Sequence, residues 1–140
     1  MKKIVGVAGL LLLAGCSTSP VSVDSATPAK AANVFAYQVK PSGPFGSLTM
    51  VRDSGFIGGG CDMGVYVDGR LAARIATQEK VTLYLPARPV VVGAGVIGAG
   101  LCGTSAARRE REIDVRDGDR LNYRVFTSGN GDTDILPTTF

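Results

Sequence analysis

Length, composition and charge describe one ordinary domain and exclude several chemistries. The chain has 140 residues, with 15 basic and 12 acidic side chains and no histidine. It therefore lacks the Ser-His-Asp and Cys-His devices and the commonest zinc and haem ligand. Its 19 glycines, 7 prolines and lack of tryptophan favour many short strands and turns over long helices.

The N-terminal segment has the layout of an export signal. Two lysines precede an apolar run over residues 4–13, which is too short for a transmembrane helix. The motif Leu13-Ala14-Gly15-Cys16 resembles the lipobox of bacterial lipoproteins. The resemblance implies cleavage before Cys16, a diacylglyceryl thioether on its sulfur and a fatty acyl group on its amine. An ordinary secretory signal with an incidental cysteine is the alternative.

This interpretation divides the chain into a signal peptide at residues 1–15, a lipidated Cys16 with a flexible tether over 16–32, and a folded domain over 33–140. The tether prediction rests on a Ser/Ala/Pro/Thr-rich stretch with no apolar period. Fully extended, such a tether would reach about 50 Å. By resemblance to the sorting rule of enteric-type bacteria, Ser17 after the lipidated cysteine implies the outer membrane; the periplasmic and the surface face both stay open.

The charge that remains after cleavage argues against nucleic-acid binding. Lys2 and Lys3 leave with the signal, so 13 of the 15 basic side chains face 12 acidic ones, and acylation of the new amine removes a further positive charge. A mature chain this close to neutral has no electrostatic footprint for nucleic acid.

From residue 33 onward, alternating apolar residues and turn signals predict about seven to eight short strands and no helix. Two half-apolar sheets must cover each other, so we expect a single, mostly antiparallel β-sandwich. The predicted strands and the last segment cover residues 33–39, 47–52, 64–67, 70–75, 81–85, 88–96, 111–115, 121–126 and 135–140.

The clearest local signal is Asp68-Gly69 between two apolar runs. Both central residues of a type I′ hairpin turn need positive φ, which this pair tolerates. The alternation then predicts Val65 and Val67 on one face with Leu71, Ala73 and Ile75, and Tyr66 and Arg70 on the other.

The lipoprotein signal, the V-x-V-D-G-x-L hairpin at Val65–Leu71 and the L-x-Y-x-V strand at Leu121–Val125 resemble, in combination, the DUF2846-like class of small bacterial lipoproteins. That class is similar to PEGA-type and other carboxypeptidase-regulatory-like sandwiches. The resemblance implies a non-catalytic envelope module of unknown ligand and transfers no catalytic residue. The stretch Pro86–Pro89 and the Gly/Cys-rich insert over 93–105 depart from the pattern.

The two remaining cysteines, Cys61 and Cys102, are expected to form a disulfide in an oxidising compartment. Closing a loop of some forty residues would stabilise the fold by roughly 4 kcal/mol. Two free or metal-bound thiols are the alternative, although two thiolates without histidine make a poor zinc site.

Other motifs have a functional and a structural interpretation. Gly93, Gly95 and Gly98 match the dinucleotide-binding spacing, with Asp114 where a ribose-binding carboxylate would stand. The helix that this motif requires would contain two destabilising glycines, and too few residues follow Asp114 to complete a doubly wound sheet. These facts favour a strand that enters a glycine-rich loop instead. Asp132 and Asp134 suggest a calcium loop or ordinary turn chemistry.

Three further features complete the candidates. Phe56 and Ile57, in a glycine-rich loop, are either a binding contact or a flap that covers the core. The mixed-charge run Arg108–Glu112 is a solvated face, or a basic patch if Arg52, Arg70 or Arg74 converge on it. Asp53 and Asp62 are the one loop carboxylate pair that an enzyme could use.

Taken together, the sequence predicts a non-catalytic, membrane-anchored envelope lipoprotein without cofactor or metal. It would bind membrane lipid through acylated Cys16 and an envelope protein or glycan through exposed loops. A surface antigen or adhesin-like lipoprotein is the alternative, and a dinucleotide-binding enzyme the more distant one.

Overall fold

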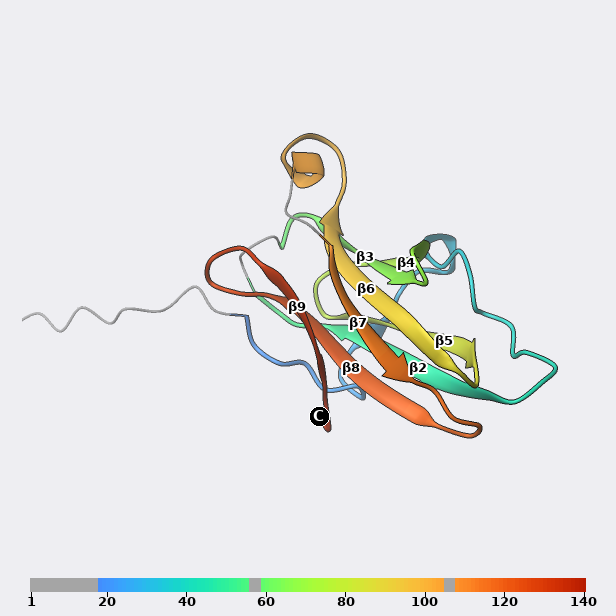
Figure 1. The fold of residues 1–140 in the computed structure, drawn as a ribbon. Coiled ribbons are helices and arrows are strands. Elements are labelled where there is room, and N and C mark those ends of the chain that lie inside the picture. The colour runs from blue at the N-terminus through green and yellow to red at the C-terminus, as the bar shows by residue number, and fades with distance from the viewer. Residues whose placement is uncertain (1–17, 56–58, 105–107) are drawn as a thin grey trace, which may run out of the picture.

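The computed structural model describes residues 18–55, 59–104 and 108–140, and these form the expected all-β sandwich (Figure 1). Two sheets pack face to face, one in the order β1-β5-β2-β8-β9 and the other in the order β4-β3-β6-β7. Most neighbouring strands are antiparallel; β2 pairs with β8, and β1 with β5, in parallel. The described residues contain nine strands: β2 to β9 match predicted ranges, and two-residue β1 was not expected from the sequence.

The elements have the following bounds: β1 Thr27–Pro28, η1 Ala31–Asn33, β2 Phe45–Arg52, β3 Asp62–Val67, β4 Arg70–Ile75, β5 Glu79–Pro86, β6 Pro89–Ile97, η2 Gly100–Thr104, β7 Arg109–Asp114, β8 Arg120–Thr127 and β9 Thr133–Pro137. The predicted ranges of β2 to β9 agree with these bounds to within a few residues. The alternating apolar side chains of these strands meet between the sheets, where Leu48, Met50, Val65, Leu83, Val92 and Ile135 are fully buried.

The Asp68-Gly69 turn is confirmed, with φ of 47° and 80° at the two residues. One detail of the hairpin differs from the prediction. A bulge shifts the register at Ala72, so Leu71 lies opposite Tyr66 and Arg70 opposite Val67, the reverse of the predicted faces. An extra residue in one strand reverses the facing of those beyond it, and simple alternation cannot anticipate that.

The expected flexible tether is wrong for residues 18–32, because this stretch packs on the sandwich. Ser19 forms a bridge with Ser54, β1 pairs with β5, and Ala26 is buried. The Lys80 Nζ also donates to the Val23 carbonyl at 2.5 Å. Backbone pairing with a sheet edge needs no apolar side chains, so the composition of the stretch did not reveal it.

The strand predicted over 33–39 is replaced by an irregular segment. Val34 forms an isolated bridge with Ala73, and the Phe35 N–H donates to the Ala72 carbonyl at 2.7 Å. The chain then leaves the sheet because Tyr37 has a φ of 61°. Residues 18–44, which we call the strap, thus run from the edge of the β5 sheet to the edge of the β4 sheet and cover one open side of the sandwich.

The two ends of the sandwich differ in what they carry. At one, which we call the Ser19 end, β2 and β8 finish, β3 begins and Ser19 bridges Ser54. At the other, the Phe45 end, β2 begins beside Pro86. The nine residue steps from Phe45 to Ser54, along β2 and just past its end, separate the two ends of the sandwich by about 30 Å.

Candidate functional site

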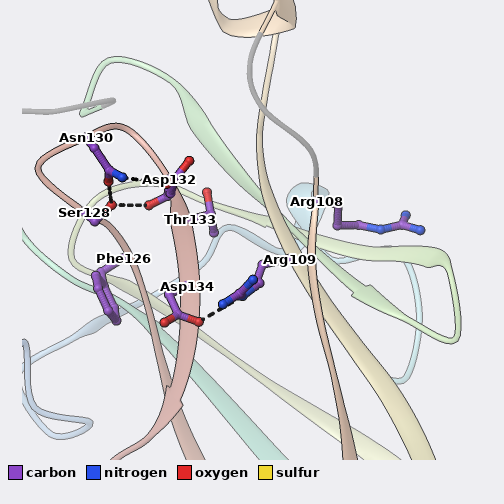
Figure 2. Close-up of a pocket in the computed structure, with 8 residues that line it drawn as sticks. All are labelled: Arg108, Arg109, Phe126, Ser128, Asn130, Asp132, Thr133 and Asp134. Atoms are coloured by element: carbon purple, nitrogen blue, oxygen red, sulfur yellow. Dashed lines mark hydrogen bonds and ion pairs between the residues drawn. The ribbon is translucent and has the colours of Figure 1, made fainter.

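A polar cleft of about 520 Å³ opens at the Ser19 end, between the start of β7 and the β8–β9 hairpin. Figure 2 shows Ser128, Asn130 and Asp132 gathered at the hairpin loop, while Asp134 faces Arg109. Arg108 points away from this group, and its guanidinium lies 4.4 Å from the centre of the Tyr66 ring.

The polar groups of this cleft mainly bind one another. Asn130 Nδ2 donates to Asp132 Oδ2 at 2.7 Å, and the Ser128 hydroxyl donates to the Asp132 carbonyl at 3.1 Å. These bonds close the β8–β9 loop as turn chemistry, the structural interpretation of Asp132. Asp134 differs from that interpretation, because it lies in β9 and pairs with Arg109. Among the described residues, no three His, Cys, Asp or Glu side chains come together in a way that could hold a metal ion.

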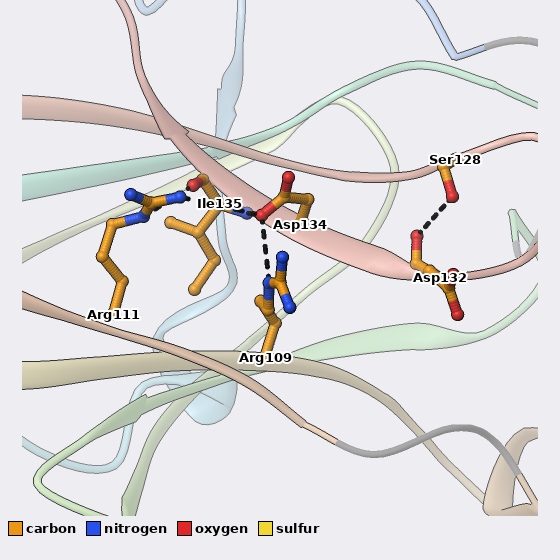
Figure 3. A network of polar contacts seen from close by, with 6 residues as sticks. All are labelled: Arg109, Arg111, Ser128, Asp132, Asp134 and Ile135. Atoms are coloured by element: carbon orange, nitrogen blue, oxygen red, sulfur yellow. Dashed lines mark hydrogen bonds and ion pairs between the residues drawn. The ribbon is translucent and has the colours of Figure 1, made fainter.

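Two arginines of β7 join the edge strands of the two sheets beside the cleft (Figure 3). Arg109 Nε donates to Asp134 Oδ1 at 3.4 Å, and Arg111 Nε donates to the Ile135 carbonyl at 3.0 Å. They close the side of the sandwich opposite the strap. The mixed-charge run Arg108–Glu112 therefore partly holds the edge strands β7 and β9 together and is not only a solvated face.

A second hollow, which we call the aromatic groove, lies at the Phe45 end and has a volume of about 500 Å³. Its walls come from the strap, the end of β5 and the start of β4, and its main residues are Phe35, Tyr37, Val39, Arg70, Tyr84 and Pro86. Large apolar side chains remain exposed here: Phe35 is 45% and Val39 83% exposed.

The backbone of the strap shapes this groove. Tyr37 has the left-handed φ of 61°, which is costly for a bulky residue and persists only where neighbours enforce it. The Tyr84 N–H donates to the Tyr37 carbonyl at 2.9 Å and fixes the segment on β5. The groove is therefore built into the fold.

Cations flank the aromatic side chains. Lys40 Nζ lies 5.6 Å from the centre of the Tyr84 ring and 6.0 Å from that of Phe45, and these two rings meet edge to face. Arg70 lines the groove from the hairpin. Exposed aromatics next to an arginine are typical of binding surfaces, since rings supply apolar contact area and the guanidinium supplies orientation.

Two of the charged residues that the sequence offered as enzyme or basic-patch candidates, Asp53 and Arg52, are engaged inside the fold. Asp53 is buried and makes a two-point ion pair with Arg124. Burial raises the pKa of Asp53 and outweighs the lowering by the hydrogen bond and charge of Arg124. Asp62 begins β3, and its charge acts on the guanidinium of Arg52.

Arg52 is also buried and so does not join a surface patch with Arg70 or Arg74, contrary to that interpretation. Its guanidinium donates to the carbonyls of Cys61 and Ile75, at 2.6 and 3.1 Å, and links β2 to the other sheet. Burial lowers the pKa of Arg52. Arg52 and Asp53 thus link strands within the Ser19 end of the fold.

The glycines with dinucleotide spacing do not form a phosphate loop. Gly93 and Gly95 lie inside β6, paired with β3 on one side and Gly93 also with β7 on the other. Their shared face receives Arg108, whose Cδ would lie 3.1 Å from a Cβ at Gly93. Among the described residues β6 leads into the 3₁₀ helix η2 and not into an α-helix, so it offers no α-helix N-terminus to a pyrophosphate, and the dinucleotide interpretation is wrong.

The remaining predicted positions have different outcomes. The Cys61–Cys102 disulfide is confirmed, with a Cα–Cα distance of 5.5 Å, and it joins η2 to the start of β3. Asp68 forms an ion pair with Arg88 as well as shaping the turn. Cys16, Phe56 and Ile57 lie outside the described residues, so their predicted roles stay predictions.

The sequence does not reveal the aromatic groove, because the alternation over residues 33–39 predicts a strand there. The signal that could have found it is the cluster of Phe35, Tyr37 and Val39 just before the turn Pro41–Pro44, with no partner strand assigned to it. The pairing with Tyr84 and Arg70 depends on tertiary structure, which no local pattern encodes.

No family model, characterised protein or solved structure matches the chain. The likeness to DUF2846-like lipoproteins therefore remains a prediction. In the part of the chain that the structure describes, no helix has the length and apolar character needed to cross a membrane.

Proposed function

We propose that the protein is a lipid-anchored, non-catalytic binding module of a bacterial cell envelope, and that the aromatic groove binds its partner, an envelope protein or a glycan. The acyl chains on Cys16 would hold it, and Ser17 favours the outer membrane as its location. Three acyl chains anchor far more firmly than one, whose binding is marginal and reversible.

The observation that carries this proposal is the position of the groove relative to the anchor. The chain that leads from Cys16 reaches the fold at Ser19, while the groove lies at the opposite end. A binding surface about 30 Å from the attachment point is turned away from the membrane and is accessible to a partner. The polar cleft, by contrast, lies at the Ser19 end with its side chains bonded to one another.

Site-specific photo-crosslinking in intact envelopes tests the groove. A photoreactive residue at Val39, which is 83% exposed in the groove, should give discrete adducts with one protein or with peptidoglycan. The matched control is the same residue at Leu101, which is 90% exposed at the Ser19 end and should not give those adducts.

A second variant makes the test specific. Arg70→Glu reverses the charge that lines the groove and should abolish the Val39 adducts without unfolding the protein, since Arg70 is exposed. Identical adducts from both positions, or none from Val39, would contradict a recognition role for the groove.

A further inference from the structure

We propose that the Ser19 end rests directly on the lipid surface that holds the acyl chains, with Leu101 in contact with that surface. This inference depends on the proposed lipid anchor and adds an orientation and a second contact to it.

The chain between the proposed anchor and the fold is short. Only Ser17 separates Cys16 from Thr18, so the two residues from Cys16 to Thr18 span at most about 7 Å. A polar headgroup layer is of comparable thickness on each side of the hydrocarbon core. The domain thus cannot swing away on a long tether as the sequence suggested.

The start of the strap is held firmly against the sandwich. The Ser19 N–H donates to the Ser54 carbonyl at 2.8 Å, and the Ser54 N–H donates back to Ser19 at 3.0 Å. Thr18 is packed on Gly55 so closely that a Cβ on that glycine would lie 2.6 Å from the Thr18 Cγ2. Gly55 also has a φ of 156°, which favours glycine.

At the Ser19 end, the short helix η2 projects from the sandwich and carries an exposed leucine. Figure 1 shows η2 extending past the end of β6, at the same end of the sandwich as the start of the described chain. Leu101 in η2 is 90% exposed. The neighbouring Cys102 is joined to Cys61, whose carbonyl is held by Arg52, so η2 is fastened to the core of the Ser19 end.

The charges at this end fit a lipid surface without requiring an anionic one. Arg109 pairs with Asp134 and Arg108 with Glu110 at 2.7 Å, so both arginines already have carboxylate partners within the protein. A single leucine is a weak membrane ligand, but the anchor raises its effective concentration at the surface and makes a weak contact sufficient.

Tryptophan fluorescence tests the orientation, because the natural chain has no tryptophan. The full-length lipidated protein would carry either Leu101→Trp or the matched control Val39→Trp, since both positions are highly exposed but lie at opposite ends. Each variant would be reconstituted into phosphatidylcholine vesicles with brominated acyl chains, and the mass of its N-terminal peptide would establish lipidation.

We expect the Leu101→Trp emission to be quenched several-fold more strongly than that of Val39→Trp and to shift to shorter wavelength. Equal quenching, stronger quenching of Val39→Trp, or no quenching in a protein with lipid on Cys16 would overturn the orientation and leave the proposed anchor standing. A mature protein without lipid on Cys16 would overturn both.

Discussion

Asp68 both forms the hairpin turn and binds neighbouring residues of the fold. Its backbone adopts the positive φ that the hairpin requires, while its carboxylate accepts from the Val91 N–H at 2.9 Å and from Arg88 at 2.6 Å. The hydrogen bond from Val91, followed by that from Arg88, lowers the pKa of Asp68. The sequence indicated the turn, but not the contact with β6, because Val91 is 23 residues away.

A lowered pKa makes this contribution to stability dependent on pH. The unfolded chain binds the proton more tightly, so the contribution is complete above the unfolded pKa of about 4 and is lost as the pH falls below it. Thermal unfolding should therefore show the wild type losing stability relative to Asp68→Asn between about pH 5 and pH 2. The effect is small because the side chain is 36% exposed.

Asn at this position is a suitable comparison because it tolerates positive φ and keeps an oxygen for the Val91 N–H. If the melting temperatures of the two proteins fell in parallel over the whole acid range, the carboxylate would have no such role.

Among the elements, η2 depends most on a single covalent link. The Cys61–Cys102 disulfide closes a sequence separation of 41 residues and holds η2 against the start of β3. Gly98 fits the same corner, since a Cβ there would lie 2.7 Å from the Cys102 Cβ. Gly98 thus permits a close approach of the backbone to the disulfide.

Removing the disulfide should lower the free energy of unfolding substantially. The double variant Cys61→Ser/Cys102→Ser should lose about 4 kcal/mol by the chain-entropy estimate for a loop of this length. Denaturant titration of the variant, of the oxidised wild type and of the reduced wild type measures this. Reduction must reproduce the loss seen in the variant; a reduced protein as stable as the oxidised one would contradict the role of the bridge.

The elements also show which structures local sequence can predict. β3 and β8 were found because their apolar residues alternate and turn residues flank them. The strap was not, because β1 is held by backbone bonds to β5 and Tyr37 departs from the sheet at a φ that its residue type does not favour. The bulge at Ala72 also depends on contacts between segments, since only the pairing with β3 reveals it.

For the whole molecule, the strap packs residues 18–32 on the sandwich in place of the flexible tether that the sequence predicts. The composition of residues 17–32 suggested a reach of tens of ångströms, but pairing at Ser19 and at β1 leaves a short connection to Cys16. A binding module of this kind would work close to its membrane, with its groove facing outward. The groove combines Phe35 and Tyr37 with Tyr84 and Arg70 from distant strands, so its position could come only from the fold.

Lipidation of Cys16 is the claim on which the proposed function and the orientation both depend, and one paired measurement tests it directly. Wild type and Cys16→Ala would be expressed in a bacterial host, the membranes separated from soluble material, and the N-terminal peptide of each analysed by mass spectrometry. The account predicts a wild type in the membrane fraction that begins at an acylated Cys16, and a folded, soluble Cys16→Ala protein. A wild type without acyl groups, or a Cys16→Ala protein that stays firmly in the membrane, would contradict it.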